Sequence, residues 1–478
     1  MRLCRTDPWL CHSSAMTSAP VAPTDSPDYA ANARFIRPWY WYDWANSAFV
    51  TTIGTVLYGP YITSIAKAAA CPGQDSDLDC ATNLHVLGIP IAPGALAPYT
   101  TTFATILSAI VLIFIGAIVD RMERPAKFLG LCAWGGAISA AGLFFVTGTR
   151  WQLGAILMVL ATVFLGSSLV TYDSMLNQIA APDDRDKVSS RGWALGYLGG
   201  GLLLAVNLVL VTMKPFGLTT GMAVRASMLS AAVWWAVFAI IPIKGMWDLR
   251  NAEKPPVAAG ESVVGGSIAQ LRNTFSDLRA HHPQTMLFLL AYLFFNDGIQ
   301  TVISSSSLYG AEELKFEQSQ LIALILLVQF VAFFGALIFG RIAARVGASK
   351  TVLGSLALWT GIVAAAYFVP EKAFIPFVLL GVAIGLVLGG SQALSRSLYS
   401  QLVPHKREAE YFALYQAMER GTSWFGTLLF GVVYQLTHTY RLAIIALIIF
   451  FVIGGFLLSR VDFREGIRQA GNTQPALI

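Results

Sequence analysis

The chain has 478 residues, of which 55% are hydrophobic and only 12% are charged. Ordinary soluble domains carry about 25% charged residues, so this composition excludes a soluble globular protein. The formal net charge of +5 does not indicate a nucleic-acid partner, because lysine and arginine collect in the cytoplasmic loops of membrane proteins.

The apolar residues form many windows of about 20 residues, the length that a helix needs to cross the roughly 30 Å hydrocarbon core of a bilayer. The sequence therefore predicts one all-α membrane domain with twelve transmembrane helices. The predicted spans are 39–66, 98–119, 127–147, 152–177, 190–213, 222–243, 285–309, 318–343, 350–369, 373–399, 411–436 and 440–459. Residues 1–33 contain no apolar segment of the signal-peptide type, and we expect a disordered N-terminal arm there.

The first span carries a polar stripe. At helical spacing, Asp43, Asn46 and Ser47 fall on one side, and apolar residues such as Phe49 fall on the other. A polar face at membrane depth needs a bundle interior or an aqueous cavity beside it. The stripe therefore predicts three contacts with a small-molecule substrate.

The stretch Tyr42-Asp43-Trp44-Ala45-Asn46-Ser47-Ala48-Phe49 resembles the start of the first helix in one branch of the major facilitator superfamily. That branch contains the vacuolar amino-acid effluxers of yeast autophagy and their bacterial relatives. The resemblance covers about residues 39–460 and implies two pseudo-symmetric six-helix halves. It also implies a secondary transporter that moves amino acids outward.

The distribution of basic residues predicts the orientation. If the N-terminus lies inside and the spans alternate, only seven of the 32 lysines and arginines fall outside: Lys67, Arg150, Lys214, Arg225, Lys315, Lys372 and Arg441. Basic residues prefer the inner side, so we expect both termini to be cytoplasmic. We place the protein in the inner cell membrane, with residues 461–478 as a cytoplasmic tail.

An internal repeat indicates the same architecture. Gly116 and Arg121 follow the second span in a Gly-x-x-x-x-Arg pattern, and Gly340 and Arg345 follow the eighth span in the same pattern about 224 residues later. Parallel repeats of this kind are typical of two-halved transporters. We predict halves at 34–244 and 285–460.

Residues 245–284 form the linker between the predicted halves. Ile268, Leu271, Phe275 and Leu278 recur at helical spacing and indicate a short amphipathic helix on the inner membrane face. A disordered linker is the alternative.

The segment after the second span resembles the superfamily loop Gly-x-x-x-Asp-Arg-x-Gly-Arg-Arg at Gly116, Asp120, Arg121 and Arg124, whereas Glu123 stands where glycine is usual. Glycine permits close helix packing, and the charges are expected to latch the inner seam in one state and release it in the other. Ordinary positive-inside charges are the alternative. Gly340 and Arg345 are the corresponding residues of the second copy.

Asp297 lies about 12 residues into the seventh span, or roughly 18 Å along a helix, near the bilayer middle. Asn296 and Gln300 lie on about the same side, and we predict that all three contact substrate. An unpaired carboxylate at this depth is costly, so Asp297 is also the candidate for coupling to a proton or cation. A satisfied helix-packing aspartate is the alternative.

Glu419 and Arg420 lie within the eleventh span, and neighbouring residues on a helix do not pair with each other. We predict a gate role for both, with substrate-anion contact as a second possibility for Arg420. Asp173 is expected to pair with Arg121 or Arg191 or to contact substrate. Arg396 joins an inner-end cluster on the tenth span.

Cys71 and Cys80 flank an acidic loop, and a disulfide between them is possible if that loop lies outside; metal binding by the loop aspartates is a second possibility. The sequence contains no catalytic motif, no Walker loop and no cofactor-binding pattern, so we expect neither an enzyme nor transport driven by ATP within this chain. A small-solute transporter is predicted, with the bilayer and a coupling proton or cation as its other partners. The alternatives are an effluxer of drug-like solutes and a transporter-shaped sensor or lipid-handling protein.

Overall fold

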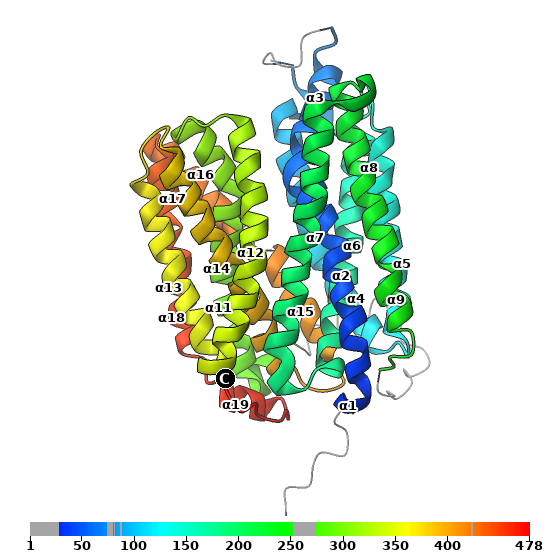
Figure 1. Ribbon diagram of the computed structural model, residues 1–478, viewed down its shortest axis with the longest axis vertical. Coiled ribbons are helices and arrows are strands. Elements are labelled where there is room, and N and C mark those ends of the chain that lie inside the picture. The colour runs from blue at the N-terminus through cyan, green and yellow to red at the C-terminus, as the bar shows by residue number, and fades with distance from the viewer. Residues whose placement is uncertain are drawn as a thin grey trace, which may run out of the picture.

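The computed structural model describes residues 28–73, 80, 82–86, 88–251, 274, 276–421 and 424–478. The chain is built from helices, which form two adjacent bundles in Figure 1. A short antiparallel hairpin, β1 (Leu84–Val86) and β2 (Ile89–Ile91), pairs Leu84 with Ile91.

The first bundle contains helices α1 to α9. Their bounds are α1 Tyr29–Asn32, α2 Ile36–Ala48, α3 Tyr58–Ala70, α4 Leu96–Asp120, α5 Pro125–Gly142, α6 Trp151–Ile179, α7 Arg185–Met213, α8 Thr220–Phe238 and α9 Ile240–Gly245. A π-helix over Phe49–Leu57 joins α2 to α3. Widened turns of this kind are frequent at functional sites.

The second bundle contains helices α11 to α19. Their bounds are α11 Pro283–Leu308, α12 Gln318–Val346, α13 Ala348–Tyr367, α14 Phe374–Gln401, α15 Glu408–Gly421, α16 Trp424–Thr437, α17 Tyr440–Ala446, α18 Ile448–Ser459 and α19 Phe463–Gln469. A π-helix over Tyr309–Glu313 follows α11.

The predicted all-α membrane fold is confirmed. In the described part of the chain, eleven helical segments are long and apolar enough to cross a membrane. The remaining predicted span, 411–436, corresponds to α15 and α16, which lie on either side of residues 422–423.

Each half has its own hydrophobic core. One set of packed apolar side chains runs from Phe35 to Leu249 in sequence, and another runs from Leu278 to Ile467. A small third cluster crosses between the halves and includes Val119 and Ala413. Most apolar packing therefore stays within a half, and each half has a core of its own.

The ends of the chain differ from the expected boundaries. Helix α1 begins at Tyr29, inside the segment predicted as a disordered arm, and Asn32 Nδ2 donates to the carbonyl oxygen of Gln178. Beyond the last span, Asn472 Nδ2 donates to the carbonyl oxygen of Gln401 at 2.8 Å, so the predicted tail packs on the bundle. Residues 1–27 lie outside the described part.

The structure also bears on the predicted disulfide and on part of the amphipathic helix predicted in the linker. Cys71 and Cys80 are joined in a disulfide. Ile268, Leu271 and Phe275 of the expected amphipathic helix lie outside the described residues, whereas Leu278 is helical and buried.

The helix α1 and the C-terminus lie at the same end of the molecule (Figure 1). An even number of spans requires this arrangement. We call this end the inner end, since it is the end that the basic residues predict to be cytoplasmic.

Candidate functional site

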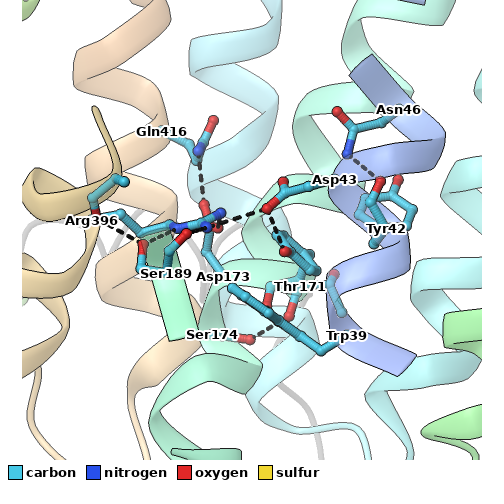
Figure 2. A network of polar contacts seen from close by, with 12 residues as sticks. Trp39, Tyr42, Asp43, Asn46, Thr171, Asp173, Ser174, Ser189, Arg396 and Gln416 are labelled. Carbon is cyan, nitrogen blue, oxygen red and sulfur yellow. Dashed lines mark hydrogen bonds and ion pairs between the residues drawn. The ribbon is translucent and has the colours of Figure 1, made fainter. Parts of the chain in front are cut away.

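An arginine of the second half is held between two aspartates of the first half. Asp43 lies on α2, Asp173 on α6 and Arg396 on α14. Arg396 Nη2 lies 3.2 Å from Asp43 Oδ2, and Arg396 Nη1 lies 3.2 Å from Asp173 Oδ1. The side chains converge in Figure 2, and the three residues are only 6%, 1% and 3% exposed, respectively. These residues, called here the seam triad, form a buried ion-pair cluster that joins the halves.

Aromatic rings surround the guanidinium of Arg396. It lies 4.9 Å from the ring of Trp39, 5.4 Å from Tyr172 and 5.5 Å from Trp193. Trp39 and Tyr172 stack with their centroids 4.2 Å apart, and the Tyr172 hydroxyl donates to Asp43 Oδ2 at 2.6 Å. Desolvated cation–π contacts of this kind favour a charged arginine over a neutral side chain.

Neutral polar groups complete the hydrogen bonds of the triad. Gln416 Nε2 on α15 donates to Asp173 Oδ2 at 2.9 Å, and Arg396 Nε donates to Ser189 Oγ at 2.9 Å. The structure thereby corrects the expected partner of Asp173. The expected partners Arg121 and Arg191 are exposed, because Asp173 faces the seam rather than the inner rim.

A glycine that sequence reasoning missed makes room for the triad. A Cβ atom on Gly192 of α7 would lie 2.6 Å from Asp43 Oδ2, 2.9 Å from the Trp39 ring and 3.1 Å from Arg396 Nη2. Any side chain at this position would displace the ion pair. Glycine is common where membrane helices approach closely, but its spacing in the sequence does not reveal which contact it protects.

The predicted latch acts as a helix cap across the seam. Asp120 Oδ1 and Oδ2 accept hydrogen bonds from the backbone N–H groups of Ala409 and Glu410 at 2.9 and 3.0 Å. These groups lie at the N-terminus of α15, where a helix carries orphan donors and partial positive charge. A Cβ atom on Gly116 would lie 2.6 Å from both the Ala409 carbonyl oxygen and the Ala413 Cβ, so α4 and α15 touch.

The repeat places its second glycine at an equivalent contact. A Cβ atom on Gly340 of α12 would lie 2.7 Å from Ser190 Oγ on α7. Gly116 and Gly340 therefore each lie where a helix of one half meets a helix of the other. This use of both copies supports the predicted two-fold relation between the halves.

The inner end is closed by hydrogen bonds between the halves. Arg185 Nη1 and Asn177 Nδ2 donate to the Ser400 carbonyl oxygen at 2.8 and 2.9 Å. Gln401 Nε2 donates to the Pro182 carbonyl oxygen at 2.8 Å. The inner ends of the two bundles are thus joined in this conformation, which we call the inner-closed state.

The surface of the inner end is basic. Arg121 and Arg345 are exposed there, and Arg124 is half-buried, as ordinary positive-inside residues are. Arg407 forms an ion pair with Asp277. Although partial burial opposes the effect, the Arg407 guanidinium lowers the pKa of Asp277 below its usual value. Asp277 therefore stays charged and fastens the end of the linker to the second half.

Asp297 lies in a packed position between α11 and α16. It is 1% exposed, and its Oδ2 accepts a hydrogen bond of 2.8 Å from the backbone N–H of Gly426, the third residue of α16. A Cβ atom on Gly426 would lie 2.1 Å from Thr301 Oγ1. One oxygen thus fits the alternative of a helix-packing aspartate, because it accepts from a helix N-terminus, whereas Oδ1 is buried without a hydrogen-bond partner in the described part of the chain.

Two other residues that were predicted to contact substrate form hydrogen bonds within the protein. Asn46 Nδ2 donates to the Tyr42 carbonyl oxygen of its own helix at 2.6 Å, and Asn296 Oδ1 accepts from Gln392 Nε2 at 2.9 Å. Ser47 and Gln300 are half-buried. Within the described part of the chain, no hydrogen bond joins these four residues to one another.

Arg420 differs from Asn46 and Asn296, which have hydrogen-bond partners within the protein. Its side chain is half-buried on α15, and within the described part of the chain its guanidinium makes no hydrogen bond or ion pair; its Nε is buried without a partner. Glu419, beside it, is half-buried and accepts a hydrogen bond from the Tyr292 hydroxyl at 3.0 Å. Arginine carries five N–H donors, so an unpaired guanidinium at this depth is a strong recognition group for an anion.

Comparison with known proteins identifies similar chains along nearly the whole length. A family model described as "Vacuole effluxer Atg22 like" matches residues 31–185 and 177–471. The uncharacterized MFS-type transporter YxiO of Bacillus subtilis is 28% identical over 426 residues, which cover 88% of this chain and 94% of that protein. Autophagy-related protein 22 of Kluyveromyces lactis is 23% identical over 479 residues, which cover 93% and 96%.

Solved structures share the fold at low sequence identity. The proton:xylose symporter XylE aligns with a TM-score of 0.66 and 12% identity, over 90% of this chain and 95% of that one. The human organic anion transporter MFSD10 aligns with a TM-score of 0.64 and 14% identity, over 89% and 99%. At these identities the likeness shows the fold alone.

Proposed function

Because the chain belongs to the vacuole effluxer Atg22-like family, a branch of the major facilitator superfamily, we propose that this multi-pass membrane transporter moves amino acids outward by alternating access. The family description supports the outward direction. Two separate cores, joined across the seam by hydrogen bonds and ion pairs, support rocking of the halves, because these polar contacts can exchange partners while each core stays packed.

Arg420 carries the proposal for the cargo. An amino acid needs an anion contact for its carboxylate and a cation contact for its ammonium group. The unpaired guanidinium suits the carboxylate, since arginine binds carboxylates through two parallel N–H···O bonds. Hydrogen bonds to charged groups contribute about 1.5–3 kcal/mol each, which is enough to make this contact decide affinity.

We assign the contact with the substrate ammonium group to a carboxylate other than Asp43 and Asp297, which the sequence predicts to contact substrate. Asp43 is paired with Arg396, and Asp297 accepts from Gly426, so both are engaged in this state. Glu419 is half-buried and adjacent to Arg420 in sequence. We therefore assign the ammonium contact to Glu419, with Tyr292 orienting its carboxylate.

Replacing Arg420 by glutamine tests the cargo. We expect wild-type protein in liposomes to exchange amino acids in counterflow from a mixed pool, at pH 6 and pH 8. The R420Q variant is expected to raise KM at least about 30-fold, because about 2 kcal/mol of charge-assisted bonding is lost. R420K keeps a charge without the planar fork, and we expect an intermediate KM.

A matched cargo control separates recognition from folding. A primary amine that lacks the carboxylate should compete weakly with wild-type uptake and equally weakly with R420Q uptake. If no amino acid is exchanged by the wild type, or if R420Q and wild type have the same KM, the cargo assignment is wrong. A screen of other small solutes in the same vesicles then tests efflux of drug-like compounds.

A further inference from the structure

The seam triad has an unbalanced charge. Asp43 and Asp173 each carry a carboxylate, and Arg396 supplies one guanidinium to both. Glu419 and Arg420 are the charged neighbours close enough to interact with this group, and their charges cancel each other. The buried cluster therefore holds one more carboxylate than arginines. Tyr172 and Tyr197 are the neighbouring titratable hydroxyls, and they are neutral at ordinary pH.

The three members of the triad belong to different moving units. Asp43 and Asp173 lie on α2 and α6, inside the first core, whereas Arg396 lies on α14 of the second half. When the inner ends separate, Arg396 leaves with the second half. The two aspartates remain together on the first half, close enough that one guanidinium bridges them now (Figure 2).

Keeping both carboxylates charged at this position without a cation has a high free-energy cost. Leaving a buried charge without its partner costs about 3–5 kcal/mol, and two adjacent carboxylates repel each other as well. The inner-open state must therefore replace the guanidinium with another positive charge. Water entering from the inner side supplies protons directly.

We propose that Asp43 and Asp173 form a proton-binding pair that exchanges Arg396 for protons when the inner side opens. Each proton taken up converts a carboxylate into a neutral carboxyl group, and each is released when Arg396 returns. The inference rests on the alternating-access part of the proposed function, and it assigns the coupling role to this pair rather than to Asp297. Acid on the inner side favours the inner-open state, because protonated aspartates no longer hold Arg396.

The test measures opening without any transported solute. Ser400 is fully buried at the closed inner end, so a cysteine introduced by S400C reports opening through its rate of maleimide labelling. Chemical reactivity of a thiol changes with pH, so each rate is divided by that of the same variant after unfolding. In wild-type background, we expect the corrected rate to rise at least about tenfold between pH 8 and pH 5.5.

Neutralising the pair should remove this dependence. D43N/D173N is expected to label at a high, pH-independent rate, because Arg396 has lost both counter-ions. The single variant D173N should move the labelling midpoint at least about one pH unit lower, since Asp43 no longer faces a like charge. The single variant decides the question if the double variant does not fold.

A matched carboxylate variant serves as the control. D297N should keep the wild-type pH dependence, because Asp297 does not belong to the triad. A pH dependence that survives in D43N/D173N, or disappears in D297N, would overturn the proposal. Replacement of choline by sodium at constant pH should have no effect; a sodium-dependent rate would identify a metal cation as the ligand and also overturn it. None of these outcomes depends on the cargo, so amino-acid exchange stands or fails separately.

Discussion

Replacing Gly116 by valine is expected to lower transport at least about tenfold by preventing the inner ends from closing. A Cβ atom at this position would lie 2.6 Å from the Ala409 carbonyl oxygen and 2.8 Å from the Glu410 Cα. Both are backbone atoms of α15, which cannot rotate away as a side chain can. Overpacking of this kind costs about 1–3 kcal/mol, and the cost falls on the inner-closed state alone.

The same substitution also moves the Asp120 carboxylate away from the N–H groups whose hydrogen bonds it accepts. Its carboxylate holds the N–H groups of Ala409 and Glu410 only while α4 and α15 touch. The S400C labelling rate should therefore rise in the Gly116→Val background at every pH. Gly361→Val is the matched control, because a Cβ atom on Gly361 of α13 meets no atom within 4 Å. Normal transport by G116V would show that this contact does not govern closure.

Asp297 should tolerate asparagine and reject alanine. The Gly426 N–H needs an acceptor at 2.8 Å, and the amide oxygen of asparagine provides one without a buried charge. We expect D297N to transport within about threefold of the wild type. D297A leaves that N–H buried without a partner, a penalty of about 1–3 kcal/mol, and should lower both thermal stability and the transport rate.

This comparison separates two roles for the same carboxylate. A capping residue needs only an acceptor atom, whereas a proton carrier needs a group that titrates. Uptake driven by a pH gradient, measured beside counterflow in the absence of a gradient, distinguishes them. If D297N abolishes gradient-driven uptake and leaves counterflow intact, Asp297 is the coupling residue and the capping role is insufficient.

Helix capping gives two of the predicted charged residues a role that the sequence does not show. The sequence shows Asp120 beside Arg121 and predicts a charge latch, and it shows Asp297 at membrane depth and predicts substrate contact. In the structure, both carboxylates accept backbone N–H groups at the start of a helix, α15 for Asp120 and α16 for Asp297. Helix N-termini attract carboxylates wherever they arrive in space, and their arrival depends on packing between distant segments.

Several features followed from the sequence alone. Twenty-residue apolar windows predict membrane spans because a helix of that length satisfies its backbone hydrogen bonds within its own segment in lipid. The Gly-x-x-x-x-Arg repeat indicates two related halves, and both of its glycines lie at contacts between the halves. The family resemblance in the first span agrees with the matched family model.

The partners of the polar residues required the tertiary structure. Asp43 and Arg396 are 353 residues apart in the chain, and Asp173 and Arg396 are 223 apart. Helical periodicity places each of them on a polar face, but it contains no information about which helix of the other half lies opposite. That choice is made by the packing of the two cores, so the seam triad, Gly192 and the unpaired Arg420 became evident only when the halves were placed together.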